Sequence, residues 1–121
     1  MPSRIPVAKE LAEIFKALSH PDRVRLIEEL RGSEQDVNTL AERLDLPGPR
    51  VSQHLGLLRA QRLVDERRDG RRHLYHLTQP EIADWIVSGL DFVEGRLSTL
   101  NAETLEAARR LWAVGGKQQS V

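Results

Sequence analysis

Residues 50–77 read RVSQHLGLLRAQRLVDERRDGRRHLYHL, and a change of period within this stretch decides the fold. Its first half places apolar residues four and three positions apart, which predicts a helix with one buried stripe formed by Val51, Leu55 and Leu58. From Leu63 the pattern becomes extended, and Asp69-Gly70 between two short runs is a strong signal for a β-hairpin. The stretch therefore predicts a basic helix that is followed by a basic hairpin.

Three further helices are predicted upstream of this stretch. Residues 6–18 carry apolar side chains at helical spacing. Ser19-His20-Pro21-Asp22 then combines a hydroxyl cap, a proline in the first turn and an acid three residues after the serine, which predicts the start of a second helix that Gly32 closes. Asp36 is placed to cap a third, short helix, and residues 46–49 are expected to form a tight turn before the fourth.

The chain downstream of the hairpin is predicted to be helical again. Thr78 and Glu81 have the spacing of a capping box and predict the start of a fifth helix. Apolar residues hold one stripe from Ile82 to Leu100, over about five turns, which is more apolar face than a small domain covers. With a sixth helix after it, we expect one domain over residues 1–114 and a disordered tail over residues 115–121.

The composition is that of an ordinary soluble protein, with 40% hydrophobic and 30% charged residues in 121. No apolar run approaches the roughly 18 residues of a membrane span, and the first residues lack the apolar segment of a secretory signal peptide. We therefore expect a cytoplasmic protein with no membrane partner. The absence of cysteine excludes disulfides and thiolate metal sites.

The charges are distributed unevenly, although the formal net charge is zero. Residues 48–76 hold 7 Lys and Arg against 3 Asp and Glu, a net charge of +4. Residues 1–47 and 77–121 each have a net charge of −2. A chance cluster of solvated arginines is the simpler explanation, but this pattern is also expected when one surface alone faces phosphates.

Three short helices, a tight turn, a basic helix and a basic hairpin define a helix-turn-helix with a wing. Each residue of a helix is rotated by about 100° from the one before it, so the fourth helix has an outer side that points away from the buried stripe. This outer side is expected to face the major groove. There Gln53 can bond adenine bidentately, Arg50 can bind guanine or phosphate, and Ser52 can bond a base or a phosphate. His54 lies nearer the buried stripe, so it either donates to phosphate or packs inside. The hairpin adds four guanidiniums for the DNA backbone or minor groove, from Arg67, Arg68, Arg71 and Arg72.

Several of these segments resemble the ArsR/SmtB family of bacterial regulators, namely residues 18–23, 51–55 and 57–59 and the wing 68–72 with Tyr75. The likeness covers roughly residues 7–97. It implies a mainly helical winged-helix fold, double-stranded DNA as partner, and a homodimeric repressor that binds an inverted repeat and pairs through its first and fifth helices. The expected interface residues are Leu11, Ile14, Phe15, Trp85, Ile86, Leu90, Val93 and Leu97, although part of this stripe also covers the core of the single chain.

The sequence departs from the family pattern where known members bind metal ions. Residues 34–38 offer no thiolate, and the four ligand positions that the likeness implies near the fifth helix are Gln79, Glu81, Phe92 and Gly95. One carboxylate does not assemble a tetrahedral zinc site. We therefore expect no metal site and no cofactor, and a regulator that responds to neither metals nor thiols. A small-molecule effector, a protein effector and no effector all stay open.

Two further departures concern DNA contacts. Pro47 stands where relatives usually carry a hydroxyl that caps the fourth helix, so one anchoring bond is expected to be missing. Arg62 stands where a glycine usually ends that helix. Either Arg62 adopts a left-handed conformation at a cost of about 1 kcal/mol, or the turn differs.

Two other classes of function fit the sequence less well. A winged-helix module that binds a protein and no DNA is the alternative hypothesis, but such modules often lack a basic reading face. The sequence contains no evident nucleophile paired with a base and no phosphate-binding glycine loop. We therefore expect no enzymatic activity.

Overall fold

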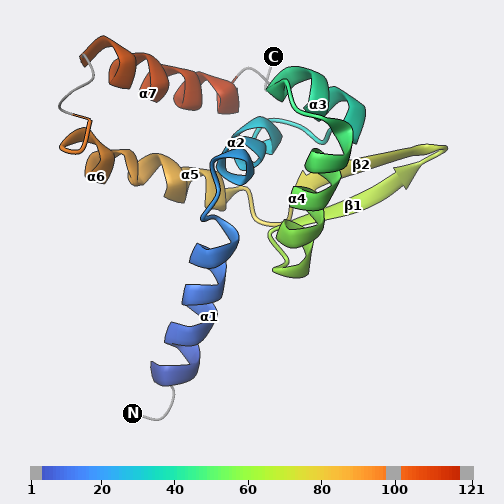
Figure 1. The fold of residues 1–121 in the computed structure, drawn as a ribbon, viewed down its shortest axis with the longest axis horizontal. Helices are drawn as coiled ribbons and strands as arrows, with labels where there is room; N and C mark the ends of the chain where they lie inside the picture. Colours follow the sequence, from blue (N-terminus) through green and yellow to red (C-terminus); the bar gives the residue numbers. More distant parts are fainter. Residues whose placement is uncertain (1–3, 98–101, 118–121) are drawn as a thin grey trace.

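The computed structural model describes residues 4–97 and 102–117 (Figure 1). It is mainly helical, with one two-stranded antiparallel hairpin, so the predicted fold class is confirmed. The elements follow in the order α1 (Arg4–Ala17), α2 (Pro21–Leu30), α3 (Val37–Leu44), α4 (Gly48–Ala60), β1 (Val64–Asp69), β2 (Arg72–Leu77), α5 (Glu81–Ser88), α6 (Leu90–Glu94) and α7 (Ala102–Lys117).

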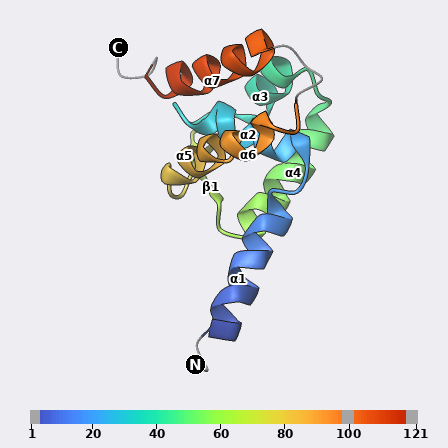
Figure 2. The same cartoon turned by 90° about the vertical axis from the view of Figure 1, so that its left-hand side faces the viewer.

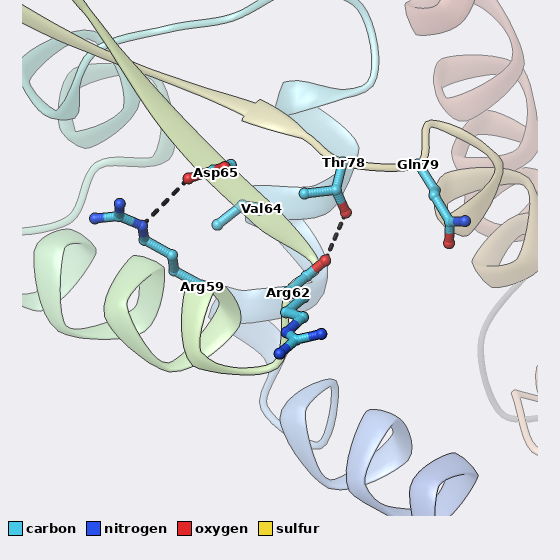
Figure 3. Close-up of a pocket in the computed structure, with 6 residues that line it drawn as sticks. All are labelled: Arg59, Arg62, Val64, Asp65, Thr78 and Gln79. Atoms are coloured by element: carbon cyan, nitrogen blue, oxygen red, sulfur yellow. Dashed lines mark hydrogen bonds and ion pairs between the residues drawn. The ribbon is translucent and has the colours of Figure 1, made fainter. Parts of the chain in front are cut away.

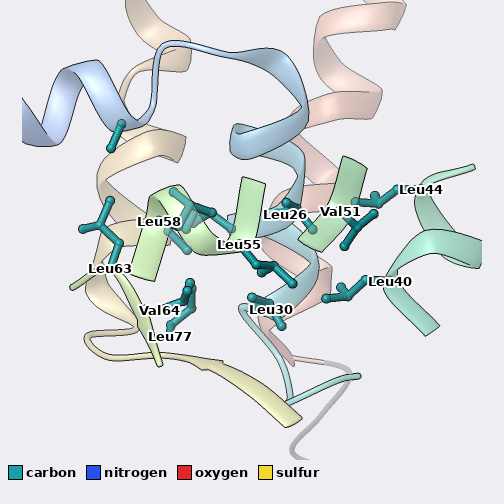
Figure 4. Packing of buried hydrophobic residues seen from close by; sticks show 13 residues of the cluster. Leu26, Leu30, Leu40, Leu44, Val51, Leu55, Leu58, Leu63, Val64 and Leu77 are labelled. Carbon is teal, nitrogen blue, oxygen red and sulfur yellow. The ribbon is translucent and has the colours of Figure 1, made fainter. Parts of the chain in front are cut away.

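The core lies where α2, α3 and α4 meet the base of the hairpin (Figure 4). The predicted stripe on α4 is confirmed, since Val51, Leu55 and Leu58 are all 0% exposed. Burial of each such side chain stabilises the fold by about 1.5–3 kcal/mol, before strain and entropy are subtracted. The stripe therefore fixes which side of α4 faces solvent.

The start of α2 differs in one residue from the predicted cap. Pro21 is the first residue of the helix, so the capping position falls to His20 rather than to Ser19. The Nδ1 atom of His20 accepts a hydrogen bond from the backbone N–H of Asp22 at 3.0 Å. The hydroxyl of Ser19 instead donates to the carbonyl of Lys16 and closes α1.

The start of α3 follows the prediction. The carboxylate of Asp36 accepts a hydrogen bond from the backbone N–H of Thr39 at 2.8 Å. The helix before it ends at Leu30, slightly earlier than the closure expected at Gly32. The turn expected over residues 46–49 is also shorter, because α4 already begins at Gly48.

The hairpin pairs β1 with β2 from Val64 opposite Leu77 to Asp69 opposite Arg72. Its turn lies at Gly70 and Arg71, one residue later than Asp69-Gly70. The reason is that Gly70 takes a positive φ of 64° at the first turn position, which leaves Asp69 in the strand.

The predicted capping box before the fifth helix is wrong. Residue Pro80 precedes α5, and no side chain caps this helix end. The hydroxyl of Thr78 donates to the carbonyl of Arg62 at 2.6 Å, so it closes the turn after α4 instead. A contact between distant parts of the chain has therefore replaced the local cap.

The single long helix expected over residues 82–100 is also wrong, because the structure divides it into α5 and α6 at Gly89. The N–H of Gly89 bonds the carbonyls of both Ile86 and Trp85, at 2.9 and 3.2 Å, which tightens the last turn of α5. Glycine costs about 1 kcal/mol relative to alanine inside a helix, so the break falls there. Residues 98–101 lie outside the described part of the chain, including the expected end at Leu100.

The outer elements leave the core in different directions (Figures 1 and 2). The N-terminal part of α1 extends away from the rest of the molecule, while α7 lies across α2. Arg31 binds the carbonyl of Trp112 at 2.6 Å and also pairs with Asp84, which attaches α7 to the body. Because α7 continues to Lys117, part of the tail expected from residue 115 is helical. None of the helices in the described residues is long and apolar enough to cross a membrane.

Candidate nucleic-acid interface

The outer side of α4 carries three polar residues that the sequence predicted to contact DNA. Arg50, Ser52 and Gln53 are exposed, as their place opposite the buried stripe requires. None of the three side chains makes a hydrogen bond or ion pair with the part of the chain that the structure describes. Their polar groups are therefore available to an external partner.

The start of α4 lacks a side-chain cap. Pro47 precedes the helix and provides no hydrogen bond to it, as its residue type dictates. Pro49 has no N–H, and the N–H groups of Arg50 and Val51 already bond the carbonyl of Pro47. The anion-binding capacity of this helix end therefore rests on the Gly48 amide and the guanidinium of Arg50.

The end of α4 is closed by a residue in a strained conformation. Arg62 has a φ of 60°, so the left-handed alternative stated for this position is correct. Its N–H donates to the carbonyl of Arg59, and the next N–H, from Leu63, donates to the carbonyl of Leu58. This motif turns the chain from α4 directly into the hairpin.

A polar hollow of about 580 Å³ lies beside this turn (Figure 3). One of its walls is Arg59, which pairs with Asp65 and Glu66 at 3.3 Å each and so has its charge balanced within the chain. The side chain of Arg62 makes no such pair among the described residues. Arg62 is therefore a free cation next to the reading helix.

The four arginines of the wing fall into two classes. Arg67 donates from Nε to both carboxylate oxygens of Glu34, at 3.0 and 2.8 Å, and this bonding lowers the pKa of Glu34. Arg72 donates to Asp36 at 3.2 Å. In contrast, Arg68 and Arg71 have no hydrogen-bond or ion-pair partner within residues 4–97 and 102–117.

These two ion pairs attach the hairpin to the segment just before α3. A short bridge between Gln35 and Tyr75 adds two backbone hydrogen bonds of 3.0 and 2.9 Å at the same place. The wing is thus held on one side by its paired arginines and presents its unpaired arginines to solvent.

His54 lies in the interior rather than on the outer side of α4. It is 7% exposed, and its Nδ1 atom lies 3.3 Å from a terminal nitrogen of Arg23. Its Nε2 atom is 3.6 Å from the carboxylate of Asp22, and its ring stacks at a tilt on His20 with centroids 4.5 Å apart. Of the two alternatives that the sequence left open, this placement favours the packed histidine over the phosphate donor.

These partners of His54 were not predictable from the sequence, because they come from about 31 residues earlier in the chain. Burial lowers the pKa of His54, and the neighbouring His20 and Arg23 lower it further, which favours the neutral ring. The spacing of His20-Pro21-Asp22-Arg23 predicts a helix start and gives no sign of these contacts to α4. Three polar residues of this segment, His20, Asp22 and Arg23, contact His54 of α4.

One group of possible metal ligands occurs here, His20, Asp22 and His54, with ligand atoms within 4.8 Å of one another. The hydrogen bonds do not fit a metal site. Arg23 can only donate, so Nδ1 of His54 accepts and its proton lies on Nε2, and Nδ1 of His20 accepts in the same way from the Asp22 amide. Metal-binding histidines do the reverse, because their second nitrogen donates to a carboxylate or carbonyl.

The face formed by α1, α5 and α6 is apolar and partly exposed. The rings of Phe15 and Trp85 stack with centroids 5.5 Å apart and are 53% and 46% exposed. A hollow of about 540 Å³ continues past them along α5 and α6. Of the other predicted interface residues, Leu11 is exposed, and the half-buried ones are Ile14, Ile86, Leu90, Val93 and Leu97.

A three-helix core, an outward polar helix and a basic hairpin together define a winged helix-turn-helix DNA-binding protein. The family model described as "Bacterial regulatory protein, arsR family" matches residues 20–66. The biofilm growth-associated repressor of Agrobacterium fabrum is 36% identical over 83 residues, which cover 69% of this chain and 71% of that protein. The chain belongs to the arsR family.

Two further comparisons agree with this assignment. The HTH-type transcriptional regulator KmtR of Mycobacterium tuberculosis is 38% identical over 80 residues, or 66% of this chain and 62% of KmtR. The crystal structure of Rv0081 from the same species superposes with a TM-score of 0.67 and 35% identity, over 78% of this chain and 95% of that one.

Family membership decides the class of function. Proteins of this family are DNA-binding transcriptional regulators. The winged helix-turn-helix domain of Mb0332 from Mycobacterium bovis, which shares this fold, is homodimeric. The expectations that this chain is a DNA-binding regulator and not an enzyme are therefore confirmed. The alternative of a protein-interaction module without DNA binding is not favoured.

Proposed function

We propose that this protein is a homodimeric repressor that binds an inverted-repeat operator through α4 and the wing. The observation that carries the proposal is the set of unpaired polar groups on one side of α4, Arg50, Ser52 and Gln53, together with the free wing arginines Arg68 and Arg71.

The proposed mechanism assigns different tasks to the two elements. The outer side of α4 enters the major groove, where Gln53 reads a base edge and Arg50 binds either guanine or a phosphate. The wing follows the adjacent backbone or minor groove, and Arg68 and Arg71 neutralise phosphates there. His54 contributes indirectly, because its side chain faces inward.

The second half-site is read by a second copy of the chain. We propose that the dimer buries the apolar face of α1, α5 and α6, since Phe15 and Trp85 would otherwise leave large aromatic surfaces in water. A twofold axis through this face places two α4 helices on the same side of the DNA, as an inverted repeat requires.

The signal that releases the repressor is proposed to be neither a thiol reaction nor binding of a metal ion. The chain contains no cysteine, and the hydrogen bonds around His54 oppose a metal ligand role. A small organic effector, a protein effector and no effector at all are the three alternatives for its regulation.

The experiment that tests this proposal is DNA binding as a function of salt concentration. We expect operator affinity to fall steeply with salt, with a logarithmic slope of about −0.9 for each phosphate contact. Arg68→Ala and Arg71→Ala should each reduce the magnitude of the slope by about 1.8, because the dimer loses one phosphate contact in each protomer. Arg67→Ala is the matched control and should change the slope less, because Glu34 already balances that charge.

Fluorescence anisotropy of a labelled duplex supplies these slopes. An affinity that does not change with salt would exclude the phosphate contacts. Equal effects of Arg67→Ala and Arg68→Ala would show that the free and paired arginines do not differ in their contact with DNA.

A further inference from the structure

Arg23, near the start of α2, connects the C-terminal end of α1 to the middle of α4. The Nε atom of Arg23 donates to the carbonyl of Ala17, the last residue of α1, at 2.6 Å. A terminal nitrogen of the same guanidinium donates to Nδ1 of His54 on α4 at 3.3 Å. Both partners are buried, so this contact lies between the elements rather than on the surface.

The chemistry of the contact requires a neutral histidine. A guanidinium has donors only, arranged in a rigid fork, so its two bonds fix two acceptors at a set angle. His54 is an acceptor at Nδ1 only while the ring is uncharged. The remaining ring N–H then faces the carboxylate of Asp22.

The contact matters for DNA reading because His54 directly follows Gln53 on α4. The apolar stripe decides which side of α4 is buried, but apolar contacts are non-directional and tolerate small rotations of the helix. A hydrogen bond has a preferred direction and restricts such a rotation. Fixing the ring of His54 thereby fixes the direction of the neighbouring reading side chain.

We propose that Arg23 is a positioning residue that couples α1 to the reading face of α4 through the neutral ring of His54. This inference rests on the proposed function, in which α1 contributes to the dimer and α4 reads the operator. The distance and angle between the two α4 helices of the dimer then depend on this one side chain.

The coupling responds to pH in one direction. The charged and titratable groups around His54 are His20 from the connection before α2, Asp22 and Arg23 from α2, and Arg50 from α4 itself. Protonation of His54 removes the acceptor of Arg23 and adds a positive charge beside two arginines. Only the carboxylate of Asp22 opposes this repulsion.

The sign follows from the lowered pKa of His54 in the folded protein. The stability that the neutral ring contributes is complete above the ordinary value of 6.5, and it is lost as the pH falls from there through the lower folded value. We therefore expect operator discrimination to decrease on acidification over this window.

The test uses the full-length dimer and measures affinity for the operator and for a base-substituted duplex between pH 8 and pH 5.5. Arg23→Met and His54→Leu should reduce discrimination by about tenfold or more at pH 7.5, while salt-dependent nonspecific binding is retained. His54→Asn keeps an acceptor near the position of Nδ1, so it should keep discrimination at pH 7.5 and remove the loss at acid pH. Arg31→Met is the matched control, because this arginine of the same region binds α7 instead of α4.

The outcomes separate this inference from the proposed function. A wild-type protein that does not discriminate between the two duplexes contradicts the proposed function itself. Wild-type discrimination that Arg23→Met and His54→Leu both leave unchanged overturns the positioning role. If these variants do not fold, His54→Asn decides. A loss of operator discrimination at acid pH that is as large in His54→Asn as in wild type overturns the positioning role. Stoichiometric Zn²⁺ binding that depends on His54 also overturns it, because the bound ring cannot keep the hydrogen bonds described.

Discussion

Gln53 is the residue with the most specific expected effect, because its amide is exposed and unpaired on the outer side of α4. We expect Gln53→Ala to reduce discrimination at one base pair of each half-site by about 1–3 kcal/mol. Anisotropy titrations with a set of duplexes, each substituted at one position, measure this change. Arg71→Ala serves as the comparison and should weaken all duplexes alike. A uniform loss for Gln53→Ala would mean that this residue is not a base reader.

Single residues were predictable from sequence where local spacing decides their environment. The period of Val51 and Leu55 predicted their burial, and the same period placed Gln53 outside. The position of His54 was ambiguous because it borders the stripe, and its partner Arg23 belongs to a separate helix. Such a contact between side chains distant in sequence leaves no periodic signal in a single sequence.

The outer side of α4 contains a glycine whose replacement separates helix stability from DNA binding. A methyl group built on Gly56 meets no atom within 4 Å, and the residue lies inside an exposed stretch of the helix. We expect Gly56→Ala to raise the free energy of unfolding by up to about 1 kcal/mol, because alanine restricts the unfolded chain and favours the helix. Urea denaturation followed by circular dichroism measures this gain.

The same Gly56→Ala variant should bind the operator less tightly, since its methyl group lies on the side that faces the groove. The free energy of unfolding serves as the control, because a variant with a disrupted fold would lose both stability and operator affinity. Tighter operator binding would show that this part of α4 does not approach DNA closely.

Whole elements were predictable where they are strongly periodic and less so at their ends. The helices before the hairpin and the hairpin itself follow the prediction, because apolar spacing and Gly70 are local signals. The hydroxyl of Thr78 fitted a capping box but bonds Arg62 across the α4 turn. The break at Gly89 was hidden because the apolar stripe continues through it.

At the scale of the whole molecule, the dimer depends on the aromatic pair between α1 and α5. We expect Trp85→Ala to weaken dimerisation by about 2 kcal/mol, or roughly thirtyfold, because a central aromatic side chain commonly dominates an interface. Sedimentation equilibrium over a range of protein concentrations measures this shift. Leu111→Ala is the control, since Leu111 is 65% exposed on α7, which is not one of the helices assigned to the interface. Equal dimer affinities for both variants would move the interface elsewhere.

The pairing of Arg67 with Glu34 and of Arg72 with Asp36 affects how the protein would search a genome. Two of the four wing arginines are already neutralised before the protein meets DNA. Each protomer is therefore expected to bind nonspecific DNA weakly and to exchange quickly between neighbouring sites. The same ion pairs hold the hairpin in one orientation, so the hairpin loses little conformational entropy when it binds the operator. Short residence on wrong sites and a small entropic cost at the right one both follow from these two acidic side chains.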